Sequence, residues 1–204
     1  QVLREYGPIS LAFLATRVAL YVAGLRFNLD LRWMFLDDVE TLHHHLLQSI
    51  YYFHAFAPGM NLITGLLLKI SSQHLLLLAT GLFWSCGLVL TASLYRILNA
   101  LGYGRRLAAA LALGFALLPQ TLFLENLYLY TYLCAGVLCA AAALFHRALL
   151  RTSALSWFWF FSACTALGWL YTVFHLAWFA LMLVLALLLG ARVAGVSAQR
   201  RSAH

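Results

Sequence analysis

Long apolar stretches separated by short polar breaks run along almost the whole chain. A transmembrane helix needs about 20 consecutive apolar residues, and six stretches approach or reach that length. They lie at residues 8–27, 75–95, 107–124, 127–146, 155–173 and 174–190. The last two form one run, which we divide near Thr172–His175 because it is too long for a single crossing. The pattern predicts an all-α bundle of about six transmembrane helices in a single domain, residues 1–204.

A more polar segment, residues 28–74, separates the first predicted span from the second. Within it, apolar residues from Phe35 to Ile50 recur every three or four positions. This spacing predicts a helix that lies in the membrane plane with its apolar face down. The apolar run at 59–70 has only 12 residues, which is short for a crossing. We expect it at the membrane interface, and a seventh crossing there is the alternative.

The composition supports the membrane interpretation. The chain is 64% hydrophobic and 9% charged, and its mean hydropathy is +0.88, whereas a soluble domain carries roughly 25% charged residues. A water-soluble surface cannot be built from this chain, so we expect a multi-pass integral membrane protein whose main partner is the lipid bilayer. The four cysteines lie inside apolar runs without disulfide or metal-ligand spacing, which indicates small buried hydrophobic side chains.

The basic residues predict the orientation. Cytoplasmic loops of membrane proteins carry an excess of Lys and Arg. With a cytoplasmic N-terminus, nine basic residues fall inside and three outside: Arg4, Arg96, Arg105, Arg106, Arg147, Arg151, Arg192, Arg200 and Arg201 against Arg26, Arg32 and Lys69. Residues 28–74 then form an extracytoplasmic loop. The net charge of +7 is explained by this asymmetry, so nucleic acid is not an expected partner.

Four of the six acidic residues lie in this loop: Asp30, Asp37, Asp38 and Glu40. Two structural interpretations stay open for them. Asp37 could cap a helix with Glu40 at its third position, as in a capping box. Alternatively, Asp37, Glu40 and His44 could bind a divalent metal, because their spacing puts them on neighbouring turns of a helix.

Two charged residues outside the loop are further candidates for the site. Arg17 falls inside the first predicted span, where an unpaired guanidinium is costly, so we expect a carboxylate or a lipid phosphate as its partner. Glu125, followed by Asn126, lies between the third and fourth predicted spans, where exposure to water is the simpler expectation. The stretch from His54 to Gly59 predicts a turn that returns the loop to the membrane.

Together these motifs resemble a known family. The stretch Leu36-Asp37-Asp38-Val39-Glu40 soon after the first span, followed by His54-Ala-Phe-Ala-Pro58-Gly59-Met60-Asn61-Leu62, resembles the GT-C superfamily of membrane glycosyltransferases. The branch with protein O-mannosyltransferases and the lipid A aminoarabinose transferase is most similar. The stretches at 95–102 and 125–128 also look similar to that group. One departure is Ala57, where members often carry a proline.

The resemblance implies a function. GT-C enzymes transfer a sugar from a polyprenyl-phosphate-linked donor on the extracytoplasmic side, with an acidic residue of the first loop as general base. Carried onto this chain, the base would be Asp37 or Asp38. The substrate-binding candidates would be Glu40, His54, Glu125 and Arg17, and Arg17 or a divalent metal would stabilise the departing phosphate.

The resemblance also implies that the chain is the N-terminal module of a longer cell-envelope enzyme, which we expect in a bacterial inner membrane. The alternative is a non-enzymatic membrane protein, either a transporter or an assembly subunit. Transporters usually place their ionisable groups near the bilayer midplane, so the acidic loop favours the enzyme.

Overall fold

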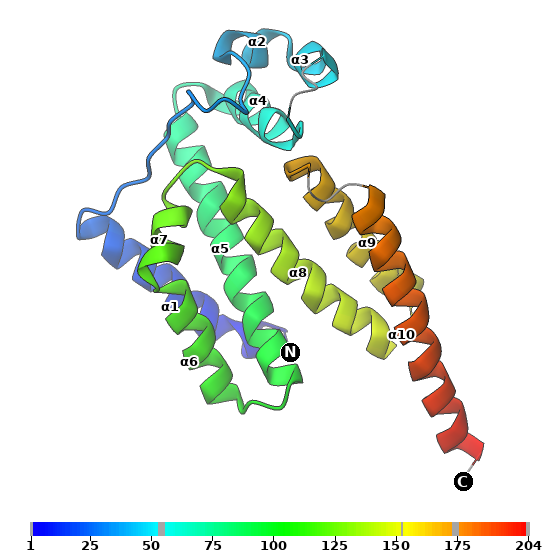
Figure 1. The fold of residues 1–204 in the computed structure, drawn as a ribbon. Helices are drawn as coiled ribbons and strands as arrows, with labels where there is room; N and C mark the ends of the chain where they lie inside the picture. Colours follow the sequence, from blue (N-terminus) through cyan, green and yellow to red (C-terminus); the bar gives the residue numbers. More distant parts are fainter. Residues whose placement is uncertain (1, 53–55, 152, 173–175, 203–204) are drawn as a thin grey trace.

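The computed structural model describes residues 2–52, 56–151, 153–172 and 176–202, and most of them are helical. The helices are α1 Val2–Val22, α2 Val39–His44, α3 Leu46–Tyr52, α4 Gly59–Ser71, α5 Leu75–Ala100, α6 Arg105–Ala116, α7 Pro119–Glu125, α8 Tyr130–Arg151, α9 Ala154–Leu170 and α10 Leu176–Ser202 (Figure 1). Within these described ranges the only β-type pairing is an isolated bridge between Asn28 and Leu127. The predicted all-α class is confirmed.

Two helices, α5 and α8, are long and apolar enough to cross a membrane. The pair α6 and α7 meets the same test together, but it is bent by 61° between the two helices. Helices α1, α4, α9 and α10 contain apolar segments of 10–17 residues, which are shorter than a full span. Within the described residues the structure therefore supports two candidate spans, or three if the bent pair counts as one. The predicted division of the last apolar run agrees with the end of α9 at Leu170 and the beginning of α10 at Leu176.

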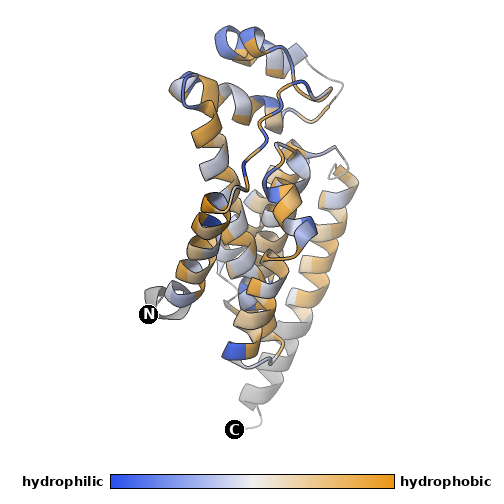
Figure 2. Cartoon of the chain, turned by 90° about the vertical axis from the view of Figure 1, so that its left-hand side faces the viewer, coloured by the Kyte–Doolittle hydropathy of each residue, from blue (hydrophilic) through white to orange (hydrophobic). Residues whose placement is uncertain are grey.

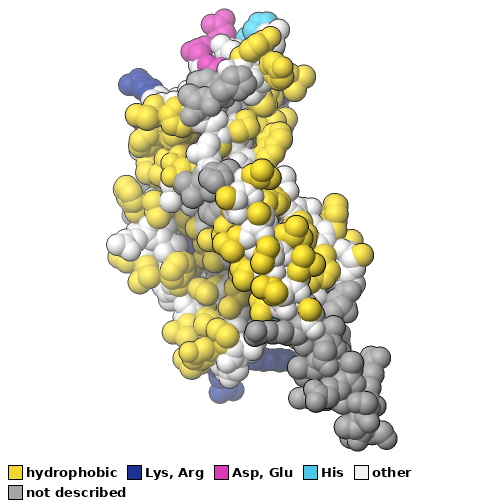
Figure 3. Space-filling view, turned by 45° about the vertical axis from the view of Figure 1, so that its right-hand side comes forward, with side chains coloured by type: hydrophobic (Ala, Val, Ile, Leu, Met, Phe, Trp, Pro, Cys, Tyr) yellow, Lys and Arg dark blue, Asp and Glu magenta, His cyan; other side chains and the backbone are white. Residues whose placement is uncertain are grey.

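The long helices form a bundle, and α2, α3 and α4 lie together over one of its ends (Figure 1). Helix α8 packs between α5 and α9, and α6 packs against both α5 and α1. Hydrophobic residues dominate the bundle helices, and hydrophilic residues gather mostly at the ends (Figure 2). In the space-filling view, acidic and histidine side chains mark the end that carries the short helices (Figure 3).

Small residues let α6 approach its neighbours closely. Ala108, Ala112 and Ala116 recur every fourth position and are almost completely buried. The first two pack with Ile9 of α1 and Tyr95 of α5 in one apolar cluster. Small residues at this spacing allow helix backbones to come near one another in a membrane protein, so the alanine stripe explains why α1, α5 and α6 can pack together.

The single helix predicted from Phe35 to Ile50 is wrong. The segment forms two short helices, α2 and α3, with a break at His45, where the backbone leaves helical dihedral angles. Leu42 and Leu46 of the predicted apolar stripe are buried, but against α4, where we expected the membrane, and the side chain of Val39 is 37% exposed. Periodicity found the apolar side of the segment, and it could not reveal that α4 covers this side or that the helix breaks at His45.

Gly65 of α4 explains how α2 and α3 come so close. A Cβ atom added there would collide with the Leu46 side chain and would lie 3.0 Å from the Leu42 carbonyl oxygen. The carbonyl is backbone and cannot turn aside. A hydrogen atom in place of a side chain is therefore what allows the two short helices to pack on α4.

We expect Gly65→Ala to loosen α2 and α3 from α4, because overpacking a tight contact costs about 1–3 kcal/mol. Hydrogen exchange of amides 38–52 should become faster in the purified variant. Gly81→Ala in α5 is the matched control, since nothing lies within 4 Å of a Cβ at position 81. Equal exchange in both variants would contradict the packing role of Gly65.

Candidate functional site

The beginning of the acidic loop is fixed to the bundle. The backbone N–H of Asn28 donates to the Asn126 carbonyl at 2.7 Å, and the N–H of Tyr128 donates to the Asn28 carbonyl at 3.2 Å. Phe27 packs edge-on against the rings of Phe83 and Tyr128, with centroid distances of 5.1 Å and 6.3 Å. The turn between α7 and α8 therefore sets where the loop starts.

Asp38 caps α2. Its Oδ2 accepts hydrogen bonds from the backbone N–H groups of Glu40 at 3.0 Å and Thr41 at 3.4 Å. These are two of the orphan donors that every helix N-terminus exposes. The capping interpretation named Asp37, and the structure corrects it by one residue. Glu40 lies exposed in the first turn, where its negative charge suits the helix dipole.

Asp37 is held by tertiary contacts instead. Its Oδ2 accepts a hydrogen bond from the Ser49 hydroxyl at 2.6 Å, and its Oδ1 accepts the backbone N–H of Asp38 at 2.8 Å. The backbone N–H of Asp37 donates to Oδ1 of Asn61 on α4 at 2.9 Å. Ser49 and Asn61 are both buried. Asp37 is thus fixed between α3 and α4, while its own side chain is only half-buried.

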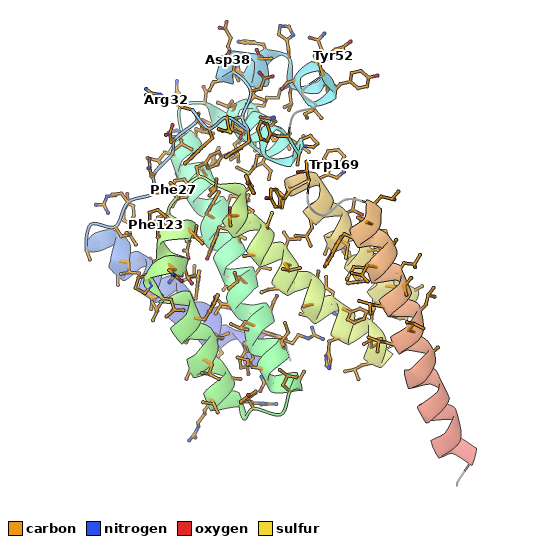
Figure 4. All side chains as sticks on the ribbon, in the orientation of Figure 1. Phe27, Arg32, Asp38, Tyr52, Phe123 and Trp169 are labelled. Carbon is orange, nitrogen blue, oxygen red and sulfur yellow. The ribbon has the colours of Figure 1, made fainter. Side chains whose placement is uncertain are left out.

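Asp37 lines two pockets. The first has a volume of about 770 Å³ and is formed by residues 28–39, including Arg32, Trp33 and Asp38. The second, of about 300 Å³, lies between α2 and α3 and is lined by Asp37, Thr41, His45, Gln48, Ser49 and Tyr52. Arg32, Asp38 and Tyr52 are labelled at this end of the molecule in Figure 4. A carboxylate shared by two pockets can contact a ligand in either.

An apolar groove lies on the other side of α4. It has a volume of about 740 Å³ and is lined by residues of α4, α5, α8 and α9, among them Gly59, Ile63, Cys86, Val137 and Trp169. Trp169 points from the end of α9 toward α4 in Figure 4. Because Gly59 lines the groove and Asn61 bonds to Asp37, the first turn of α4 separates the apolar groove from the acidic site.

Arg17 and Glu125 form a buried ion pair inside the bundle. The guanidinium donates through Nε to Oε1 at 2.7 Å and through Nη2 to Oε2 at 2.6 Å. The exposed fractions of the two side chains are 2% and 0%. A carboxylate partner for Arg17 is therefore confirmed. The exposure expected for Glu125 is wrong, because a partner 108 residues away in the sequence draws it into the bundle.

The ion pair gathers five helices. Nη2 of Arg17 also donates to the Ala116 carbonyl at 2.9 Å, which satisfies an orphan carbonyl at the C-terminus of α6. The Tyr132 hydroxyl of α8 donates to Oε2 of Glu125 at 2.8 Å. Gly87 of α5 leaves the necessary room, because a Cβ there would lie 2.6 Å from the Tyr132 hydroxyl and 2.8 Å from the Phe13 ring. The guanidinium of Arg17 and the carboxylate of Glu125 are thus paired with each other inside the bundle.

The remaining predicted site residues do not join these clusters. Among the described residues, no three His, Cys, Asp or Glu side chains are grouped to hold a metal ion, so the proposed set Asp37, Glu40 and His44 is not assembled. The cysteines are free thiols inside the bundle. His54 lies outside the described residues. Sequence reasoning did not identify Ser49, Tyr128 or Tyr132, and the signal that could have found them is a polar group inside an apolar run.

We expect Arg17→Met and Glu125→Met to be strongly destabilising as single substitutions, because each leaves one uncompensated buried charge at a cost of about 3–5 kcal/mol. The double variant should regain much of that loss, since it removes both charges. Thermal unfolding of detergent-purified protein measures all three. A double variant at least as unstable as the sum of the singles would contradict the pairing.

No family model, no curated protein and no solved structure matches this chain. The resemblance to GT-C glycosyltransferases, which rests on short motifs, therefore stays a prediction. The function has to be argued from the geometry of the chain's own residues.

Proposed function

We propose that this chain belongs to a membrane glycosyltransferase that transfers a sugar from a polyprenyl-phosphate-linked donor to a hydroxyl acceptor, with Asp37 as the general base. The observation that carries the proposal is the placement of Asp37. Its half-buried carboxylate accepts a hydrogen bond from Ser49 of α3, its backbone N–H donates to Asn61 of α4, and the residue borders two pockets. Positioning of this kind is what a base needs to reach the proton it removes.

The acidic pair has two different tasks in this proposal. Asp38 uses its carboxylate to cap α2, so it supports the site without taking the proton. Asp37 accepts the proton of the acceptor hydroxyl. The acceptor oxygen then bonds to the anomeric carbon, and the bond from that carbon to the phosphate oxygen breaks, which releases the lipid phosphate. One carboxylate next to both substrates is sufficient for this displacement.

The surroundings suit an amphiphilic donor. The larger polar pocket offers the charged side chains of Asp30 and Arg32 and the aromatic ring of Trp33, which can bind hydroxyl-rich and anionic groups. The apolar groove beyond α4 suits a hydrocarbon chain. Arg17 is left out of direct phosphate contact in this proposal, because its guanidinium is buried and bonded to Glu125. Glu40 and His54 stay substrate-binding candidates.

The proposal includes a topology of about six crossings with residues 28–74 outside the cell membrane. The short helices α2 and α3, which follow Asp37 and Asp38 in the chain, lie at one end of the bundle, and the turn from α5 to α6 lies at the other (Figure 1). Arg105 and Arg106 are exposed at the beginning of α6. The pair Arg105 and Arg106 at the end opposite the short helices agrees with the positive-inside rule, because nine basic residues fall on that predicted side and three on the other.

The topology predicts opposite accessibility for two positions in intact cells. A cysteine introduced at Glu40 should react with a membrane-impermeant thiol reagent from outside, and one introduced at Gly104 should react only after permeabilisation. Both positions are exposed in the structure, so burial would not explain a slow reaction of either cysteine. Labelling of position 104 from outside would overturn the orientation.

For catalysis, we expect Asp37→Asn to lower sugar transfer by about 10²–10⁴-fold, because the amide keeps the size of the side chain and removes its basicity. Asp38→Asn should stay within a few-fold of the parent, since Asn caps helices about as well as Asp. The assay measures transfer from a panel of polyprenyl-phosphate sugars in membranes that contain the full-length protein.

Asp38→Asn is the matched control, because it is the same substitution one residue away. Membrane abundance of each variant separates loss of chemistry from loss of protein. Near-parental transfer by Asp37→Asn would eliminate the assignment of the base, and an equal large loss in both variants would show that the two aspartates do not divide their tasks.

A further inference from the structure

A series of buried contacts connects the ion pair of the bundle to Asp37 in the outer loop. Three residues after Glu125, the Tyr128 hydroxyl lies 2.8 Å from Oγ1 of Thr64 on α4. One turn earlier on the same helix, Asn61 accepts the backbone N–H of Asp37. Tyr128, Thr64 and Asn61 have no exposed surface. Water therefore cannot replace these hydrogen bonds while the packing stays closed.

The direction of the Tyr128–Thr64 hydrogen bond follows from the proton count. Thr64 has one hydroxyl proton, and it is donated to the Met60 carbonyl at 2.7 Å within α4. The Tyr128 hydroxyl must then be the donor to Thr64. The contact is thus a specific link between the α7–α8 turn and α4.

Helix α4 carries this link to the acidic site. Residues three apart lie on the same side of a helix. Asn61 and Thr64 therefore share one side of α4, where Asn61 contacts the loop and Thr64 contacts the α7–α8 turn. The α7–α8 turn also holds the loop directly, through the two backbone bonds of Asn28. Both attachments begin within three residues of Glu125, whose position is set by Arg17, Tyr132 and the space above Gly87.

We propose that the Arg17–Glu125 pair positions Asp37 through the Tyr128–Thr64 hydrogen bond and α4. Arg17, Glu125, Tyr128, Thr64 and Asn61 are then positioning residues for the acidic site. The proposal rests on the proposed function only for the chemical role of Asp37. The coupling itself can be tested without any substrate.

The test uses Ser49→Cys as a reporter in the full chain. Ser49 is buried with its hydroxyl against the Asp37 carboxylate, and a thiol has nearly the same shape. The rate at which a water-soluble maleimide modifies this thiol in membranes reports how closed the site is. The chain without the reporter gives the background from its own four cysteines.

Tyr128→Phe and Thr64→Val remove the same hydrogen bond from opposite ends. Each should speed modification of the reporter by about three- to tenfold, and the double variant should add little, because the two changes break one interaction. Thr64→Ser keeps the hydroxyl and should keep the parental rate. Glu125→Gln weakens the ion pair at the other end of this series of contacts, and it should also speed modification of the reporter thiol.

Thr91→Val is the matched control. It removes a buried threonine hydroxyl that bonds only within α5, to the Gly87 carbonyl at 2.8 Å, and it should leave the rate unchanged. Asn61→Ala breaks the last contact directly and should open the site. Membrane abundance is measured for every variant. If Thr64→Val does not accumulate, the result for Tyr128→Phe decides the outcome, because it is the mildest change.

Parental modification rates in Tyr128→Phe and Thr64→Val would overturn the inference, whether or not Asn61→Ala opens the site. An equal acceleration in Thr91→Val would also overturn it, because the effect would then be general loosening. If the coupling is found but Asp37→Asn transfers sugar at the parental rate, the assignment of Asp37 as the base fails and the positioning of residue 37 stands. If the coupling is found and the parent protein transfers no sugar from any donor of the panel, the proposed function fails and the positioning again stands.

Discussion

The arrangement of the bundle depends on one buried ion pair. A guanidinium away from water needs a carboxylate and further acceptors, and Arg17 finds them in Glu125 and the Ala116 carbonyl. Glu125 lies on α7 and Ala116 on α6, so these contacts bring both helices to Arg17 on α1. Such pairs contribute little net stability compared with apolar side chains of similar size, but leaving one partner alone is costly. The pair therefore selects one arrangement of α1, α6, α7 and α8 over alternatives that would leave a charge unpaired.

Sequence patterns predicted the local features well and the distant ones poorly. Run length placed the boundary between the last two apolar segments close to the end of α9 and the beginning of α10. The break at His45 depends on how α2 and α3 fit over Gly65, which lies on another helix. The burial of Glu125 depends on an arginine 108 residues earlier. Periodicity carries no information about partners on other helices, so these two features could not be predicted from it.

The aspartate pair shows the same limit at the candidate site. Two identical side chains in adjacent positions cannot be distinguished by composition or spacing. In the structure, Asp38 turns to the N-terminus of α2 and Asp37 turns to Ser49 on α3. Asn61 could be noticed as a polar residue in an apolar run, but its bond to Asp37 crosses from α4 to the loop. The acidic motif was visible in the sequence, and the division of tasks within it was not.

The separation between Arg17 and Glu125 has a consequence for biogenesis. Ribosomes add about 5–20 residues per second, so the 108 residues between the two partners take roughly 5–20 s to make. Throughout that interval α1 carries a cation whose eventual partner, Glu125, has not yet been made. Its charge must be kept in water, at the lipid headgroups or inside the insertion machinery until the α7 segment emerges. Helix α1 therefore reaches its final contacts only after α7 has been synthesised.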